Sequence, residues 1–158
     1  ENLFRRSLYT FWKRMAPPPN METFNAPSRE VSCLRRERTN TPLQALVTLN
    51  ETIFMECAQA LAWRTLERAG KTADERVAYA FRRVLSRPPT PEEKADLEGL
   101  LERQEKRIAE GWVNAAEIAT GKGESPSRAP AGATPAELAA YTVVSRVLLN
   151  LDETITKE

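Results

Sequence analysis

The stretch RRERTNTPLQALVTLN, Arg35–Asn50, joins a charged segment without periodicity to a strongly periodic one. Thr41 suits the N-cap of a helix because its hydroxyl can accept a hydrogen bond from a free amide, and Pro42 suits the first helical turn. Apolar side chains then recur at helical spacing, at Leu43, Leu46, Val47, Ile53, Phe54, Cys57, Leu61 and Leu66. The pattern predicts one helix over residues 42–69, about 40 Å long and ended by Gly70.

A helix of this length is expected to be the central one, with the other segments packed around it. Asn50 falls between apolar positions, so we expect it to face inward, where it needs a hydrogen-bond partner. The segments on either side of this helix also show helical spacing, so the sequence predicts an all-α fold. It is an irregular bundle of about five helices around one long central helix, with an extended N-terminal arm.

The segments before the central helix are basic. Residues 1–15 place apolar and basic side chains at helical spacing, and three consecutive prolines, Pro17–Pro19, end that helix. Residues 16–40 have no sustained period and predict an irregular basic arm, which Val31 and Leu34 could pin to the bundle.

The segments after it predict a helical bundle over residues 41–158, within a single domain that spans the chain. Thr72, Thr90 and Thr134 each precede a helical pattern and are followed three residues later by glutamate, which is the spacing of a capping box. Glycine, serine and proline predict a mobile loop near residues 120–133. The tail beyond Asp152 is expected to fray.

Composition narrows the classes of function. The chain has 158 residues, 41% hydrophobic and 28% charged, with a formal charge of +1 and no histidine. This balance is typical of a globular domain and gives no global field for nucleic acid, which we do not expect as a partner. Residues 1–40 hold eight Lys/Arg against four Asp/Glu. We therefore expect the basic arm and the acidic remainder to attract each other.

The sequence offers no cofactor or metal site. Without histidine it lacks the usual base at neutral pH and the commonest metal ligand. Cys33 and Cys57 have no CxxC spacing, and they form either a disulfide or two separate thiols, with Cys57 on the apolar face of the central helix. No apolar run reaches the roughly 18 residues of a transmembrane helix.

The best candidate site is the junction of the arm and the central helix. Planar cations and neutral polar groups gather there beside a positive helix end, which suits an anion or a charged partner. These residues are Arg35, Arg36, Arg38, Thr39, Asn40 and Thr41. Alternatively, the arginines bridge the arm to acidic residues or to the last carbonyls of a helix. The glutamates of residues 98–105 fit a solvated helix face, and none is expected to have a raised pKa.

Several segments together resemble a known family. They are RRSLYTFWKR (Arg5–Arg14), the proline run, FNAPSRE (Phe24–Glu30), RRERTNTPLQAL (Arg35–Leu46) and LLNLDE (Leu148–Glu153). The combination is similar to a bacterial domain of unknown function, the C-terminal part of large exported proteins of the planctomycete-type cytochrome c family.

The resemblance implies a context rather than an activity. It implies an extracytoplasmic location, haem only in an upstream domain, and that this chain is the C-terminal half of a larger domain. Its partners would be upstream domains of the same polypeptide, with carbohydrate as a further candidate. We expect a non-catalytic structural or interaction module. The alternative is part of a polysaccharide-acting or redox enzyme whose catalytic groups lie mostly upstream.

Overall fold

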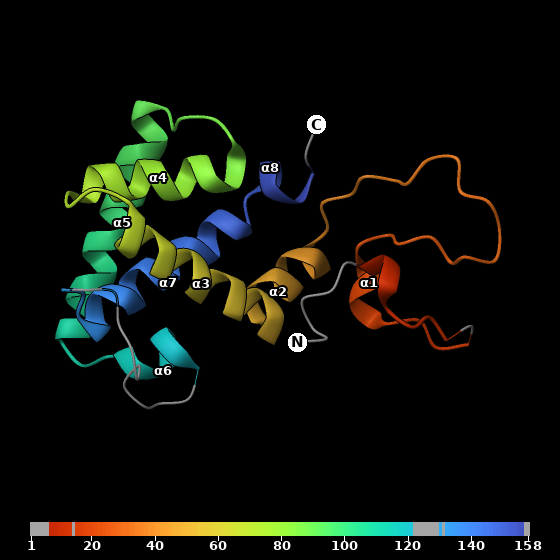
Figure 1. Cartoon of the computed structure of the whole chain (residues 1–158), viewed down its shortest axis with the longest axis horizontal. Helices are drawn as coiled ribbons and strands as arrows, with labels where there is room; N and C mark the ends of the chain where they lie inside the picture. Colours follow the sequence, from red (N-terminus) through yellow and green to blue (C-terminus); the bar gives the residue numbers. More distant parts are fainter. Residues whose placement is uncertain (1–6, 14, 122–129, 131, 157–158) are drawn as a thin grey trace.

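The computed structural model describes residues 7–13, 15–121, 130 and 132–156, and its regular structure is helical (Figure 1). An isolated bridge between Lys13 and Ala16 is the only β-pairing within this described part. The α-helices are α1 (Pro19–Thr23), α2 (Pro42–Asn50), α3 (Thr52–Arg68), α4 (Ala73–Leu85), α5 (Pro91–Ala109), α6 (Ala115–Thr120), α7 (Pro135–Leu149) and α8 (Asp152–Ile155). The expected all-α class is confirmed. Within the described residues, no helix has the length and apolarity needed to cross a bilayer.

The predicted single helix over residues 42–69 is wrong, because the chain breaks at Glu51. This residue is extended, with φ −69° and ψ 135°, so α2 and α3 are separate helices. The break is supported by side chains that satisfy the last carbonyls of α2. Arg146 of α7 donates to the Leu49 carbonyl at 2.7 Å, and Asn50 donates to the Leu46 carbonyl at 2.9 Å. Asn50 is exposed, so the expectation that it faces inward is wrong.

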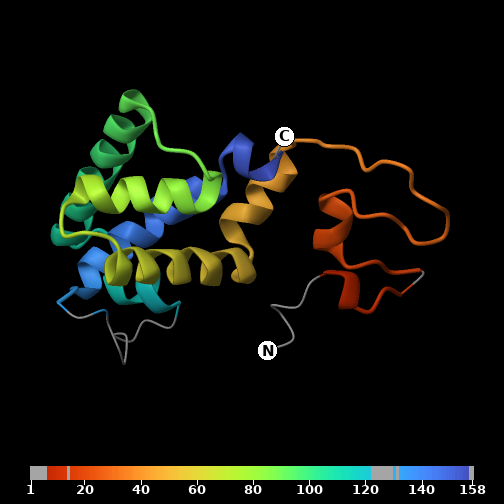
Figure 2. The ribbon, with the colours of Figure 1, turned by 45° about the horizontal axis from the view of Figure 1, so that its top comes forward.

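The most enclosed helix is α7, which contacts α2, α3, α4, α5, α6 and α8. Apolar residues lie on most sides of this helix. Its buried residues include Leu138, Ala139, Ala140, Tyr141, Val144 and Leu148. A helix that is apolar nearly all round is stable only when other helices surround it. Figure 2 shows α7 running beneath α4 and alongside α3. The centre of the bundle is thus α7, together with the buried face of α3.

The predicted helix starts are confirmed. The hydroxyls of Thr72, Thr90 and Thr134 each accept a hydrogen bond from the backbone amide of a glutamate three residues later. The predicted loop near residues 120–133 lies mostly outside the described residues. The tail does not fray over residues 152–155, which form α8, because tertiary contacts of its carboxylates hold it in place.

The predicted N-terminal helix over residues 1–15 is wrong where the structure describes it. Only Ser7–Tyr9 form a short 3₁₀ turn, while residues 1–6 and 14 lie outside the described part. Arg29, with a positive φ of 66°, donates to the carbonyls of Ser7 and Thr10 and lies 5.3 Å from the Trp12 ring. The N-terminal segment is therefore organised by the arm, not by helical periodicity.

Between α1 and α2, the arm extends away from the bundle and comes back to it as a wide loop (Figures 1 and 2). It contains α1, which contacts α2, and Phe24 packs against Phe54 of α3 with ring centroids 5.9 Å apart. Val31 and Leu34, expected to pin the arm, are 75% and 102% exposed. Among the described residues, no arginine of the arm forms an ion pair with the bundle. In the described part of the arm the expected attraction therefore takes no form of direct ion pairing, and hydrogen bonds hold the base of the arm.

Candidate functional site

The start of α2 is capped as the sequence predicts. Thr41 is the N-cap, Pro42 occupies the first turn, and the Gln44 amide donates to the Thr41 hydroxyl at 3.2 Å. The Gln44 side chain completes a capping box by accepting from the Thr41 amide at 2.9 Å. Proline lacks an amide proton, and the Gln44 amide is already bonded. The end of α2 therefore has few free donors for an anion.

Gln44 also joins three separate segments, and it is only 2% exposed. Its side-chain amide donates at 2.9 Å to both the Thr23 carbonyl and the Thr39 hydroxyl. Asn25 donates to the same hydroxyl at 2.7 Å. We call Gln44, Thr23, Asn25, Thr39 and Thr41 the Gln44 cluster. It ties the end of α1 to the end of the arm and to the start of α2.

Sequence reasoning missed Gln44, although a signal for it exists. Threonine followed three residues later by glutamine has the spacing of a capping box. That signal predicts the bond to Thr41. It does not predict the bonds to Thr23 and Thr39, which require α1 to fold back onto α2.

The predicted site residues divide into engaged and free groups. Arg36 donates to the Phe24 carbonyl at 2.7 Å and to the Asn25 carbonyl at 3.1 Å, just beyond the end of α1. Asn40 donates to the Asp152 carboxylate of α8 at 2.7 Å. Arg36 thus takes the alternative role of binding carbonyls at a helix end. Asn40 links the arm to the far end of the chain.

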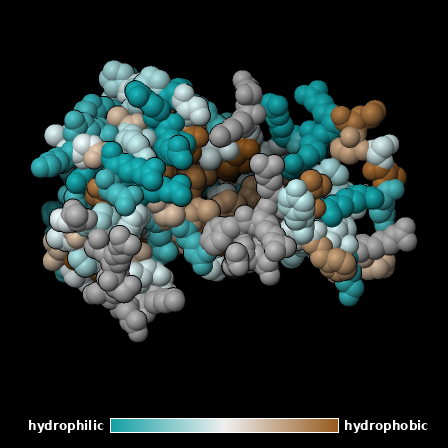
Figure 3. All heavy atoms as spheres, viewed as in Figure 1, coloured by the Kyte–Doolittle hydropathy of each residue, from teal (hydrophilic) through white to brown (hydrophobic). Residues whose placement is uncertain are grey.

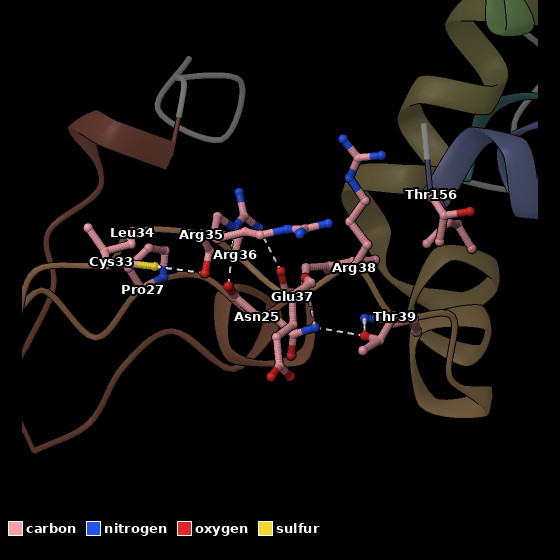
Figure 4. Close-up of a pocket in the computed structure, with 13 residues that line it drawn as sticks. Asn25, Pro27, Cys33, Leu34, Arg35, Arg36, Glu37, Arg38, Thr39 and Thr156 are labelled. Atoms are coloured by element: carbon pink, nitrogen blue, oxygen red, sulfur yellow. Dashed lines mark hydrogen bonds between the residues drawn. The ribbon is translucent and has the colours of Figure 1, made fainter. Parts of the chain in front are cut away.

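Arg35 and Arg38 are the free cations of this set. Both are exposed, and neither guanidinium forms a hydrogen bond or ion pair with any other residue that the structure describes. Figure 4 shows the Arg38 guanidinium and the Glu37 carboxylate projecting to opposite sides of the arm. Removing Arg35 or Arg38 therefore removes no internal contact of the described fold.

A hollow of about 650 Å³ lies between the arm, the start of α2 and the end of α8. Its lining combines cations with apolar side chains, among them Leu34, Arg35, Arg38 and Ile155 (Figure 4). Of the residues that the structure describes, Glu37 is the only carboxylate in that lining, and the chain has no histidine. The hollow therefore has donors for a carboxylate or another oxyanion, but it lacks a pair of groups for acid–base catalysis.

Exposed large apolar side chains concentrate in the same part of the chain. They are Leu8, Tyr9, Phe11, Met15, Val31, Leu34, Leu43, Leu46 and Trp112. All except Trp112 precede residue 47, although the bundle makes up most of the protein. Figure 3 shows brown, apolar side chains on the N-terminal side of the molecule. Leu43 and Leu46, predicted to face the core, point to solvent because polar Gln44 and Thr48 occupy the buried side of α2.

Glu153 of α8 is held by an ion cluster. Arg87 donates to Glu93 at 2.6 and 2.9 Å and to Glu153 at the same two distances, and its guanidinium lies 4.9 Å from the Phe81 ring. Hydrogen bonds from Arg87, and then from the Thr90 amide, lower the pKa of Glu93 to about 2. The cluster joins the α4–α5 connection to α8 and explains why the tail is ordered.

A second cluster corrects an expectation about acidity. Arg76 pairs with Glu137 and lies 5.7 Å from the Tyr141 ring. The pKa of Glu105 is raised, first by loss of solvent around its carboxylate and then by repulsion from the Glu137 and Glu102 carboxylates. The expectation that no glutamate of residues 98–105 has a raised pKa is therefore wrong for Glu105. Burial also raises the pKa of Tyr141. These residues join α4, α5 and α7 and do not line the hollow.

The two cysteines differ in their relation to the site. Cys33 and Cys57 are both free and exposed, so the two-thiol alternative is confirmed, but Cys57 does not lie in the apolar core. Cys33 lines the hollow, and its thiol donates to the Arg35 carbonyl at 3.3 Å. In the ranges that the structure describes, no three side chains of His, Cys, Asp and Glu come together to hold a metal.

Comparison with known proteins gives one match. No curated protein and no solved structure matches the chain significantly. The sequence profile of one family matches residues 1–101, which include the arm, α2, α3, α4 and most of α5. Because this match covers more than half of the 158 residues, the chain belongs to the PSD1 family, described as a protein of unknown function (DUF1553).

Proposed function

We propose that this chain is a non-catalytic helical module that docks against other domains of one large extracytoplasmic protein. The observation that carries the proposal is the exposure of large apolar side chains and two free guanidiniums on the N-terminal region. Large apolar residues gathered on one region are typical of protein interfaces. The helices behind this region give it a capped, well-packed support.

The family resemblance supplies the context of the proposal. Exported cytochrome c-like proteins of this type would place a haem domain upstream, with this chain as the C-terminal half of a larger domain. The residues present do not fit haem themselves, because the chain has neither histidine nor a CxxCH motif. The expected partners are therefore upstream domains of the same polypeptide, reached through the arm.

A binding measurement tests the docking role. The region encoded upstream in the full-length gene product is expressed separately and titrated against this chain by calorimetry. We expect saturable binding that weakens about tenfold or more in the double variant Val31→Ser/Leu34→Ser, since burying one such side chain contributes roughly 1.5–3 kcal/mol. Trp112→Ser is the matched control, because Trp112 is 73% exposed but lies outside the N-terminal region. Absence of binding, or equal loss in the control, contradicts the proposal.

A second candidate function is favoured by the hollow. Part of a polysaccharide-acting or redox enzyme would need a concave, polar subsite near Arg35–Asn40, and the hollow lies there. Its catalytic groups would come from the upstream region. Turnover of a polysaccharide by the full-length protein, lost on Arg35→Gln/Arg38→Gln with folding intact, would favour this candidate over the docking module.

A further inference from the structure

The backbone of the arm is unpaired over a long stretch. From Val31 to Asn40, no backbone amide donates a hydrogen bond to another residue that the structure describes. Residues 31–38 are all exposed, so their backbone is open to an external partner. Figure 2 shows this stretch as an open loop that the bundle does not cover. Such a backbone can pair with another extended chain, as exposed sheet edges do.

The C-terminal half of this stretch is fixed in position. Arg36 binds the carbonyls of Phe24 and Asn25, while Thr39 accepts from both Asn25 and Gln44. The arm is therefore closed at its base without using its own amides. Fixing this half of the stretch lowers the ordering cost that an incoming chain would otherwise meet.

The side chains of the same stretch select a charge. The Arg35 and Arg38 side chains have no partner among the described residues, and no bend or turn lies between them. Guanidinium groups bind carboxylates through paired hydrogen bonds. Leu34 is fully exposed beside them, so apolar contact is available next to the cations.

We propose that residues 31–40 bind an acidic protein segment in extended conformation. Two carboxylates of that segment pair with Arg35 and Arg38, its backbone hydrogen-bonds with the free amides, and an apolar side chain covers Leu34. The unpaired amides favour a peptide over a free oxyanion or an acidic glycan, because only a peptide supplies a regular series of carbonyls. This proposal rests on the docking function and names the chemistry of its partner.

The test uses a fluorescein-labelled, eight-residue threonine peptide with glutamate at positions 3 and 6, which repeats the three-residue spacing of Arg35 and Arg38. Its binding is followed by anisotropy at low ionic strength. The whole chain should bind it, and Arg35→Gln/Arg38→Gln should weaken binding about tenfold, as two exposed charge pairs imply. Arg64→Gln/Arg83→Gln removes the same charge from exposed positions of α3 and α4 and should leave affinity within about twofold. A peptide N-methylated at every residue should also bind more weakly, because the methyl groups keep its carbonyls from approaching the free amides closely, at constant charge.

Each contrary result has a defined meaning. Absence of binding by the wild-type chain overturns the proposal, as does equal weakening in the two double variants. Binding of oligogalacturonate as tightly as the peptide, or indifference to N-methylation, overturns the peptide assignment in favour of a carboxylate site open to glycans. If the acidic peptide fails but the upstream region still binds, the docking function stands and this inference alone is wrong. If both fail, both are wrong.

Discussion

Replacing Gln44 with alanine should loosen the junction between the arm and the bundle. The side chain makes three hydrogen bonds of 2.9 Å, accepting from the Thr41 amide and donating to the Thr23 carbonyl and the Thr39 hydroxyl. Each such bond contributes about 0.5–1.5 kcal/mol net, so their joint loss should cost about 2–3 kcal/mol. Gln44 is almost fully buried, so water cannot replace these bonds without rearrangement.

Gln44→Glu separates the two roles of this residue. A glutamate keeps the oxygen that accepts from the Thr41 amide, so the capping box survives. It replaces the donor that serves the Thr23 carbonyl with a second oxygen, which repels that carbonyl. Near pH 7 an almost fully buried carboxylate then faces a carbonyl, so we expect Gln44→Glu to be at least as destabilising as Gln44→Ala although it keeps the capping box.

Two measurements check this prediction. Hydrogen exchange read by NMR at the amides of Thr41 and Gln44 reports local opening, and 2 kcal/mol corresponds to roughly 30-fold faster exchange. Urea unfolding followed by circular dichroism reports the part of the loss that reaches the whole bundle. Gln104→Ala is the control, since Gln104 sits in α5 and makes no side-chain hydrogen bond with the described residues. The reasoning is refuted if exchange and urea midpoint in Gln44→Ala match those of the control.

Three further predictions follow from the same structure. The pKa of Glu93 is about 2 in the folded protein against an ordinary value of 4.5. Its bond to Arg87 therefore stabilises the fold fully above pH 4.5, and this stabilisation is lost as pH falls towards 2. Arg87→Met should flatten the pH dependence of Tm between these values, and an unchanged slope would count against the cluster. Ser86 ends α4 with a positive φ of 63°, so Ser86→Gly should raise stability by up to about 1 kcal/mol in urea unfolding, whereas destabilisation would contradict the left-handed cap. Trypsin should cut first after Arg35 or Arg38, because both are exposed on an unpaired backbone. Mass spectrometry identifies the first cuts, and first cuts within α3 or α4 would show that the arm is protected.

The helix starts and the fold class could be predicted from the residues because they depend on local chemistry. Thr72 and Thr90 carry the whole capping signal within four residues, and the structure confirms both. The buried face of α2 could not be predicted this way. Apolar spacing pointed to Leu43 and Leu46, but Gln44 is the buried residue, since its polar atoms are satisfied by α1 and the arm.

The candidate site was predicted only in part. The residue types between Arg35 and Thr41 indicated a charged junction, and the structure places a hollow there. Which arginines remain free depended on where α1 ends, because the carbonyls of Phe24 and Asn25 bind Arg36 and leave Arg35 and Arg38 to solvent.

The sequence by itself determined an all-α chain with capped helices and a basic, irregular arm, because these properties depend on neighbours a few residues apart. Tertiary structure decided the break at Glu51, the enclosure of α7 and the path of the arm away from the bundle. Each of these depends on contacts between residues far apart in the chain, such as Arg146 with Leu49 and Asn40 with Asp152. Local periodicity contains no information about such pairs, so only the folded arrangement could show them.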